Sequence, residues 1–315
     1  MKASQLTGVF LDAATMGQDI DLELLNALPL DWISYPYTSP NEVLERSNNA
    51  QVIITNKVKL DASVLSQLPA LKLICVAATG MDNIDLVAAE SHGVTVKNAK
   101  NYAGNSVAQL VISLMLELVN NTSKYSQRVQ QGYWSKSKSF CLLDFPISEL
   151  TNKTLGLIGY GTLAKSVEKI AAAFDMKVII SDHKDANTVR EGRVSFDEVL
   201  KTSDVISIHC PLTAKTTNLI SAPELNLMKS NAVIINTARG GIINEADLIE
   251  ALQQNKILGA AVDVLTVEPP TADHLMLNTP LDNLIITPHI AWASVEARQR
   301  LLQQVCDNIT EHFAL

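Results

Sequence analysis

The stretch Thr154-Leu155-Gly156-Leu157-Ile158-Gly159-Tyr160-Gly161-Thr162-Leu163-Ala164 decides the fold of the larger part of the chain. It begins as a near-continuous apolar run, which is typical of a parallel strand covered on both faces. A G-x-G-x-x-A pattern then opens an Ala-rich helical segment. In such a turn the first glycine permits the tight bend, the second lets a pyrophosphate approach the backbone, and a small third residue lets helix and strand pack closely. By itself the pattern also fits an ordinary strand-to-helix turn.

An acidic residue further along supports dinucleotide binding. Asp182 ends the apolar run 178–181 and stands about 20 residues after Gly161, where an acid accepts hydrogen bonds from the adenosine ribose and repels a 2′-phosphate. We therefore predict a cofactor site for NAD(H) in preference to NADP(H), although Lys184 lies close enough to soften that repulsion.

Apolar runs alternate with amphipathic stretches on both sides of this turn. The second half of the chain predicts a doubly wound, Rossmann-type sheet with strands at 154–159, 177–181, 204–209, 232–237, 259–264 and 284–287. The first half predicts a smaller, flavodoxin-like α/β domain with strands at 7–11, 32–35, 52–55, 72–77 and 94–96. An amphipathic stretch at 294–312 is expected to return to the smaller domain. We thus expect one domain of residues 1–100 and 291–315 and another of residues 101–290.

Composition narrows the class of partner. The chain has 315 residues, of which 47% are hydrophobic and 18% are charged, and a formal net charge of −8 without any long Lys/Arg run. These values favour a small-molecule partner and disfavour nucleic acid or a membrane surface. Four cysteines without a Cys-x-x-Cys pair favour buried free thiols over disulfides or a zinc site, and hence a reducing cytoplasm. The longest apolar run, 107–119, is too short to span a bilayer, and the N-terminus lacks an export signal.

Three short segments near the C-terminal end carry candidate chemistry: Asn236–Gly241, Val262–Pro270 and Thr287–Trp292. Each follows an apolar run, so their polar side chains should emerge at one edge of the predicted sheet. A site that binds a carboxylate and transfers a proton needs a cation for the first task and an acid or base for the second. The planar fork of Arg239 suits the first role. His289 suits the second, and a neighbouring carboxylate such as Glu268 would favour its charged form and fix its tautomer.

Each of these residues also has a structural interpretation. Arg239 could be a solvated arginine in a turn, and Glu268 a surface or helix-capping acid before two prolines. A Thr-Pro-His sequence after a strand is often structural, so the sequence around His289 does not decide whether this histidine is catalytic. His209 also ends an apolar run, and spacing alone does not choose between the two histidines.

In this order, and downstream of the glycine turn, the segments resemble the D-isomer-specific 2-hydroxyacid dehydrogenase family over nearly the whole chain. Residues Ala77–Asp85 and Phe140–Pro146 are similar to its glycerate dehydrogenase/hydroxypyruvate reductase branch. The resemblance implies NAD(H) on the larger domain and a small 2-oxo or 2-hydroxy acid in a cleft between the domains. It implies reduction of hydroxypyruvate to D-glycerate, with glyoxylate as a further substrate. The alternatives are D-lactate, phosphoglycerate or formate dehydrogenase activity, or an NAD(H)-sensing, corepressor-like binding protein.

The family also implies residue roles. Its acid matches His289, with Arg239 and Glu268 as the other catalytic residues, whereas its equivalent of His209 lies in a cofactor-proximal loop. Asp263 would meet the nicotinamide amide. The implied cofactor contacts are Gly159, Tyr160, Gly161, Thr162, Leu163, Asp182, Cys210, Pro211, Thr216, Thr237, Ala238, Arg239, Asp263 and Ser106.

The smaller domain should supply the other wall of the substrate site. Ala78-Thr79-Gly80 follows an apolar strand, and its backbone N–H groups can form an anion nest; the alternative is a plain turn capped by Asp82. Lys57 is a weaker candidate contact, or else a solvated lysine. Trp292 either roofs the pocket or belongs to the core. Together with Arg239, these are the predicted substrate contacts.

A polar stretch follows the helix expected at 106–121. In the family the corresponding stretch is an arm used in dimerisation, so we expect a homodimer held by residues 125–145, with Tyr133, Trp134 and Phe140 as anchors. The alternative is an excursion folded on its own subunit.

Overall fold

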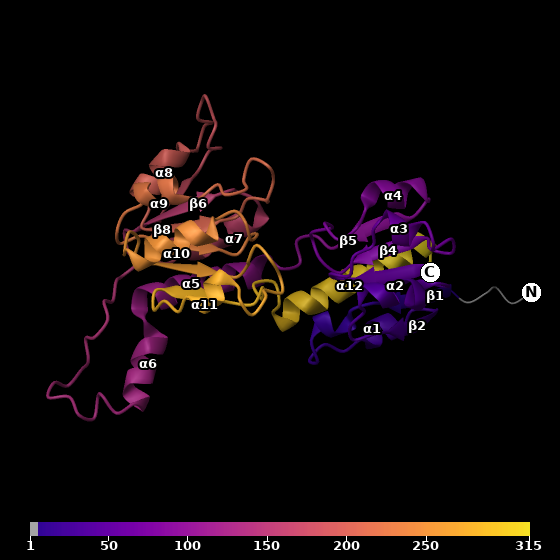
Figure 1. Cartoon of the computed structure of the whole chain (residues 1–315), viewed down its shortest axis with the longest axis horizontal. Coiled ribbons are helices and arrows are strands. Elements are labelled where there is room, and N and C mark those ends of the chain that lie inside the picture. The colour runs from indigo at the N-terminus through magenta and orange to yellow at the C-terminus, as the bar shows by residue number, and fades with distance from the viewer. Residues whose placement is uncertain (1–5) are drawn as a thin grey trace, which may run out of the picture. The chain divides into compact units, whose positions relative to one another are not determined.

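The computed structural model describes residues 6–315, and they form two compact units (Figure 1). One unit consists of Met1–Ala103 and Ala293–Leu315, and the other of Gly104–Trp292. Each is built on one parallel sheet with helical crossovers. The predicted α/β fold class with two parallel sheets is therefore confirmed.

The smaller unit has five parallel strands in the order β2-β1-β3-β4-β5, which is the flavodoxin-like order. The central strands β3 and β4 are buried along their whole length, as expected where helices cover both faces. The strands are β1 (Leu6–Phe10), β2 (Leu30–Ser34), β3 (Val52–Thr55), β4 (Leu73–Val76) and β5 (Thr95–Asn98). The helices before the last are η1 (Ala13–Met16), α1 (Glu23–Asn26), η2 (Pro40–Glu42), α2 (Val43–Ser47), α3 (Ala62–Leu65) and α4 (Leu86–Ser91).

The C-terminal helix α12 (Val295–Phe313) belongs to this unit, where it packs on β4 and α1. In Figure 1 it is the yellow helix among the indigo and violet elements. Ser294 caps its start by accepting the N–H of Ala297 at 3.2 Å. The buried Arg298 ties it to Asp19, with N···O distances of 2.5 and 2.8 Å.

The larger unit has six parallel strands in the order β11-β10-β9-β8-β6-β7. A large apolar cluster from β8, β9, β10 and the helices α8 to α10 forms its core. The strands are β6 (Thr154–Ile158), β7 (Lys177–Ile180), β8 (Val205–Ile208), β9 (Val233–Asn236), β10 (Gly259–Val262) and β11 (Leu284–Ile286). The helices are α5 (Gly104–Asn120), α6 (Thr122–Gln130), α7 (Thr162–Ala172), α8 (Phe196–Thr202), α9 (Ala222–Leu227), α10 (Glu245–Gln253) and α11 (Leu275–Asn278).

Every strand expected from the sequence is present, and no end differs by more than two residues. A capping box begins α9 at Ser221, whose backbone N–H and hydroxyl both donate to Glu224, at 3.0 and 2.6 Å. At Ser195 only half of the box forms in the described chain, because its hydroxyl accepts the N–H of Glu198 without a return bond.

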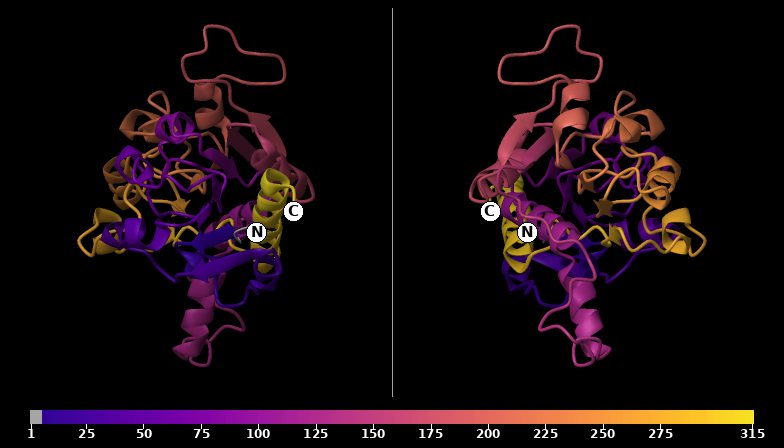
Figure 2. Two further views of the ribbon diagram at one scale, coloured as in Figure 1. Left: turned by 90° about the vertical axis from the view of Figure 1, so that its right-hand side faces the viewer. Right: turned by 90° about the vertical axis from the view of Figure 1, so that its left-hand side faces the viewer.

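The stretch after α5 projects from the larger unit as α6 and a long loop (Figure 2). The loop is closed on itself because the Tyr125 hydroxyl donates to the Phe145 carbonyl at 2.6 Å and accepts its N–H at 3.1 Å. The Trp134 indole likewise donates to the Phe140 carbonyl at 2.9 Å. The Phe140 side chain itself is 89% exposed.

Four cysteines are free. Burial raises the pKa of Cys75 to about 12 and that of Cys306 to about 11. Cys141 and Cys210 are partly exposed, so the expectation of burial is wrong for these two, which lie in loops. Across residues 6–315 no helix combines the length and hydropathy that a membrane span needs. In the same part of the chain, no group of three or more His, Cys, Asp or Glu side chains is placed to hold a metal ion.

Candidate functional site

The glycine turn between β6 and α7 is shaped for close approach of a ligand. Gly159 has φ +90°, and a Cβ there would meet the backbone nitrogen of Cys210 at 2.6 Å, so only glycine fits. A Cβ on Gly161 would meet nothing within 4 Å, and no described side chain caps the start of α7 there. The eleven-residue helix thus begins without a side-chain cap and with open space beside Gly161, and backbone N–H groups at such a helix start bind phosphate groups. The turn fits the pyrophosphate of a dinucleotide.

A cavity of about 340 Å³ lies beside this turn. It is formed by the ends of β6 and β7, the loop between β7 and α8, and the loop after β8. Apolar side chains that could pack on an adenine ring include Ile158, Phe196 and Leu219. Polar residues that line it include Asp182 and Thr216. Successive strands are added on opposite sides of β6, with β7 on one side and β8 on the other, and ligands of doubly wound sheets bind at such a switch point.

Asp182 is not the open carboxylate that the sequence predicts. Its side chain is 1% exposed and is covered by Arg190, whose Nη2 and Nε donate to Oδ1 at 2.5 and 2.9 Å. The N–H groups of Arg190 and His183 add bonds at 2.8 Å each. The Arg190 side chain, followed by these N–H groups, holds the pKa of the carboxyl well below its usual range. Lys184 instead pairs with the buried Glu224 at 2.8 Å.

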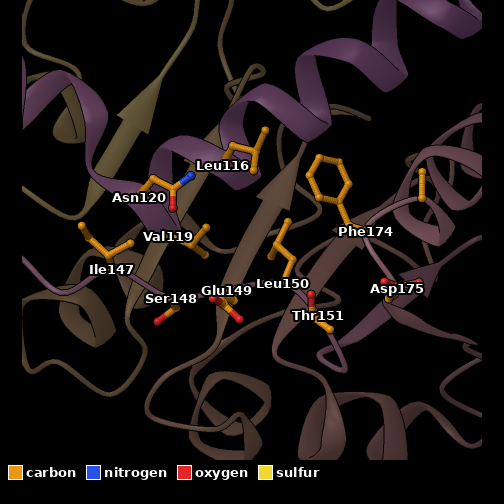
Figure 3. Close-up of a pocket in the computed structure, with 11 residues that line it drawn as sticks. Leu116, Val119, Asn120, Ile147, Ser148, Glu149, Leu150, Thr151, Phe174 and Asp175 are labelled. Atoms are coloured by element: carbon orange, nitrogen blue, oxygen red, sulfur yellow. The ribbon is translucent and has the colours of Figure 1, made fainter.

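A second cavity of about 340 Å³ lies at the far end of α5 (Figure 3). Leu116, Val119 and Asn120 of α5 line it together with Phe174 and residues 147–151. Its lining contains Glu149 and Asp175 but no Lys, Arg or His. Because an anionic dinucleotide needs positive charge and backbone N–H groups, the cavity beside the glycine turn is the better candidate.

The proposed acid and its partner are in direct contact. His289 Nδ1 lies 2.6 Å from Glu268 Oε2, with both side chains about a third exposed. Glu268 Oε1 accepts the N–H of Leu265 at 2.8 Å, which fixes the carboxylate against its own loop. Since Nδ1 is occupied by the carboxylate, Nε2 is the ring atom left for a substrate.

The turn that carries His289 is held by a buried carboxylate at the end of β10. Asp263 Oδ1 accepts the Thr287 hydroxyl at 2.5 Å and the Ile290 N–H at 2.9 Å, and Oδ2 accepts the Ala291 N–H at 2.8 Å. His289 has φ +55°, and its own N–H donates to the Asp263 carbonyl at 2.8 Å. Burial raises the pKa of Asp263, and these hydrogen bonds oppose that rise. A non-glycine residue in this backbone region is strained, so the clamp keeps the histidine in place.

Arg239 lies in the turn after β9 and next to the loop of Glu268. Asn236 shapes the turn by accepting the Ala238 N–H at 3.0 Å and donating to the Arg239 carbonyl at 2.8 Å. A Cβ on Gly240 would lie 1.9 Å from the carbonyl oxygen of Leu265, so the two loops pack backbone to backbone. The guanidinium is partly buried, with Nη1 donating to the Ala238 carbonyl at 2.8 Å.

A further pair, which the sequence did not reveal, anchors the loop of Glu268. The N–H and hydroxyl of Thr266 both donate to Glu245, at 2.8 and 3.0 Å. The other oxygen of Glu245 lies 3.3 Å from His274 Nε2. Glu245 begins α10 and His274 precedes α11, so two helix ends hold this loop.

His209 has a different environment from His289. Its Nε2 lies 2.9 Å from the Ser207 hydroxyl, and burial lowers its pKa to about 4. It is therefore neutral near pH 7 and does not supply a proton there. Between the two histidines, the environment favours His289 as the acid.

The other predicted contacts of the larger unit lie around these loops. The Thr216 hydroxyl donates to the Pro211 carbonyl at 2.6 Å, which shapes the loop after Cys210. Ser106 donates to the Ala291 carbonyl at 2.7 Å, and the Trp292 indole donates to the His289 carbonyl at 3.0 Å. The remaining ones are Tyr160, whose hydroxyl donates to Glu168; Thr162 and Leu163, which begin α7; and Thr237, whose buried hydroxyl has no partner within residues 6–315.

The smaller unit has its own switch point, between β1 and β3. The buried Asp12 follows β1 and accepts the N–H groups of Asn56 at 2.9 Å and Lys57 at 2.7 Å, so it fixes the loop after β3. Lys57 is exposed. After β4, Thr79 is exposed and Gly80 partly so, and their N–H groups donate to no group of the described chain. These N–H groups could receive a carboxylate, as an anion nest does.

Comparison with known proteins agrees with this geometry. The family model "D-isomer specific 2-hydroxyacid dehydrogenase, NAD binding domain" matches residues 112–291. The glycerate dehydrogenase of Methylorubrum extorquens is 44% identical over 97% of this chain and 96% of its own length. The hydroxypyruvate reductase of Blautia hydrogenotrophica is 36% identical over 93% of this chain and 92% of its own. An acyclic imino acid reductase solved with NADPH and D-Arg superposes with a TM-score of 0.83 at 28% identity, covering 98% of this chain and 97% of that one.

Proposed function

Since the chain belongs to the D-isomer-specific 2-hydroxyacid dehydrogenases, a family of nicotinamide-dependent oxidoreductases, we propose that it reduces hydroxypyruvate to D-glycerate with NADH. The observation that carries the proposal is the 2.6 Å contact between His289 and Glu268, because the loop of Glu268 also packs against the turn of Arg239. The names of the relatives at 44% and 36% identity support the choice of hydroxypyruvate within the family.

In the proposed reaction, Arg239, His289 and Glu268 each have a separate role. When bound, the reduced nicotinamide supplies the hydride that adds to the carbonyl carbon. Arg239 holds the substrate carboxylate, because its planar guanidinium matches two oxygens. Charged His289 donates its Nε2 proton to the carbonyl oxygen as negative charge develops there. Glu268 stabilises the charged ring and holds the Nδ1 proton, so that the ring is left neutral with Nε2 ready to accept a proton in the reverse reaction.

Substrate binding is assigned to the smaller unit as part of the same proposal. Ala78, Thr79 and Gly80 would bind the carboxylate through backbone N–H groups, and Lys57 would add a positive charge. Trp292 would border the substrate, since its indole is fixed to the turn of His289. For the cofactor, we propose contacts from the glycine turn and from the loop of Cys210, Pro211 and Thr216, whereas the buried Asp182 would act through Arg190, which covers it.

A substrate panel tests the activity. Hydroxypyruvate, glyoxylate, pyruvate and phosphohydroxypyruvate should be compared by the loss of NADH absorbance, and formate with NAD⁺. We expect the highest kcat/KM with hydroxypyruvate. A clear preference for phosphohydroxypyruvate would refute the assignment, and NADH binding without turnover of any acid would favour a binding protein.

The assembly and location belong to the proposal as well. We propose a homodimer through the arm formed by α6 and its loop, because Phe140 and Leu143 are 89% and 78% exposed and a lone subunit would leave them in water. Light scattering that gives a monomer mass at micromolar concentration would contradict it. Four free cysteines support a cytoplasmic location, which fractionation of cells would test.

A further inference from the structure

The adenosine end of the cofactor cavity carries more positive charge than an NAD-specific site needs. Its lining includes four basic side chains and two aspartates: Lys184, Arg190, Arg193, Lys215, Asp182 and Asp185. Most of these belong to the loop between β7 and α8, which projects from the end of the sheet (Figure 2). An acid at the end of β7 excludes a 2′-phosphate only if its negative charge faces the ribose.

Arg190 changes the charge that the cavity presents at the end of β7. The Asp182 side chain is 1% exposed, whereas that of Arg190 is 51% exposed, so the guanidinium lies over the carboxylate. Arg190 uses Nε and Nη2 for the pair. A guanidinium has five N–H donors, and within residues 6–315 Nη1 donates to no acceptor. A ligand thus meets a positive edge with unused donors where the sequence predicts a negative oxygen.

We propose that Arg190 admits the 2′-phosphate of NADP(H), so that the chain binds NADP(H) as well as NAD(H). The inference rests on the dinucleotide site proposed above and specifies its cofactor range. Arg190 can bind the phosphate with Nη1 while Nε and Nη2 stay on Asp182, because the two edges of a guanidinium each match a pair of oxygens. Asp182 then positions the arginine and does not repel the phosphate.

The neighbouring basic residues are less suited to this role. Lys184 is held by the buried Glu224 at 2.8 Å, and Arg193 Nη1 donates to the Ser181 carbonyl at 2.9 Å. Lys215 is exposed and makes no hydrogen bond or ion pair in the described chain, so it adds charge without a fixed direction. Of the two that a carboxylate orients, Arg190 is the more exposed, at 51% against 42% for Lys184, and it has a guanidinium edge that matches two phosphate oxygens.

Binding to the full-length protein tests the inference without relying on turnover. The dissociation constants of NADH and NADPH would be measured by cofactor fluorescence. Adenosine 2′,5′-bisphosphate and 5′-AMP would serve as competitors, because they differ in the 2′-phosphate alone. We expect the wild type to bind NADPH within about tenfold of NADH, a free-energy difference of about 1.4 kcal/mol or less. Arg190→Ala should weaken NADPH and the bisphosphate by about 10- to 100-fold, the usual cost of a lost charge-assisted bond. NADH and 5′-AMP should change by less than about threefold.

Two further variants show whether the planar guanidinium or only its positive charge matters, and whether the effect is specific to this site. Arg190→Lys keeps the positive charge without the planar guanidinium, so its NADPH affinity should lie between that of Arg190→Ala and that of the wild type. The matched control is Lys201→Ala, which removes a basic side chain of the same unit that pairs with Asp197 at 3.2 Å and does not line the cavity. It should leave both affinities unchanged. Thermal melts of each variant show that it is folded.

The outcomes are distinguishable. If the wild type binds NADH but not NADPH, or if Arg190→Ala binds NADPH as the wild type does, the inference is wrong and the dinucleotide site stands. If the wild type binds neither cofactor, the proposed function is wrong and the inference falls with it. Selective loss of NADPH and of the bisphosphate in Arg190→Ala supports both.

Discussion

Glu268→Gln tests the proposed acid most directly, because it keeps the shape of the side chain and removes its charge. Glu268 uses one oxygen for the Leu265 N–H and the other for His289 Nδ1, at 2.8 and 2.6 Å. A glutamine has one oxygen, so its amide N–H₂ must face one of these two donors. Charge-assisted hydrogen bonds contribute about 1.5–3 kcal/mol and neutral ones about 1 kcal/mol, so the change costs the charged ring about 1–2 kcal/mol. A third of the carboxylate is exposed, which places the effect toward the lower value.

Reduction needs the charged ring, so kcat/KM for hydroxypyruvate should fall by about 5- to 30-fold. The assay is NADH oxidation at saturating cofactor, with NADH affinity measured separately by fluorescence to show that the cofactor site is intact. His289→Asn is the reference for complete loss of the acid and should lower turnover by about 10²- to 10⁴-fold while NADH still binds. If Glu268→Gln turns over like the wild type, or His289→Asn retains most of its activity, the assignment of acid and partner is wrong.

The other predictions concern the scaffold of the site. Gly240→Ala places a Cβ 1.9 Å from the Leu265 carbonyl oxygen, so it should lower both kcat and the melting temperature; an unchanged melt would contradict the packing of the two loops. Burial lowers the pKa of His209 from 6.5 to about 4, so the unfolded state takes up the proton first, and acidification from pH 6.5 to 4 should lower the free energy of unfolding by about 3 kcal/mol. In denaturant titrations, the free energy of unfolding of His209→Asn should lack this pH dependence. An equal loss of stability on acidification in the variant would show that other groups cause it. Asp12→Asn turns an amide toward the N–H groups of the loop after β3, so the KM for hydroxypyruvate should rise while NADH affinity stays; a shift in NADH affinity alone would argue against that loop as a substrate wall.

Most of the scaffold follows from local sequence patterns. Parallel strands covered on both faces are short apolar runs, and these runs located every strand to within two residues. The glycine turn was recognisable because its function needs backbone without a Cβ, as Gly159 shows. The loops of Arg239, Glu268 and His289 could be placed at one edge because parallel strands end on the same side of a sheet.

The pairings made by loop side chains could not be predicted. Arg190 stands in an irregular loop, where neither helical nor strand periodicity fixes the direction of a side chain, so the sequence indicates only Lys184 as a residue that softens the repulsion from Asp182. The structure reverses that expectation, because the lysine is bound to Glu224. The bond from Thr266 to Glu245 that anchors the Glu268 loop could not be predicted for the same reason, since Thr266 and Glu245 are far apart in the sequence and neither belongs to a recognisable pattern.

Asp263 shows why residue roles inferred from a family need geometry beside them. The family implies a contact with the nicotinamide amide, yet both oxygens of this carboxylate already hold the turn on either side of His289. A carboxylate can accept about four hydrogen bonds, so the three in the structure leave room for one more, and both roles are compatible. Loss of turnover in a variant of Asp263 would therefore not distinguish a cofactor contact from a displaced acid. Only the affinity for NADH separates them, because displacement of His289 lowers turnover without removing a cofactor contact, whereas loss of the amide partner weakens binding itself.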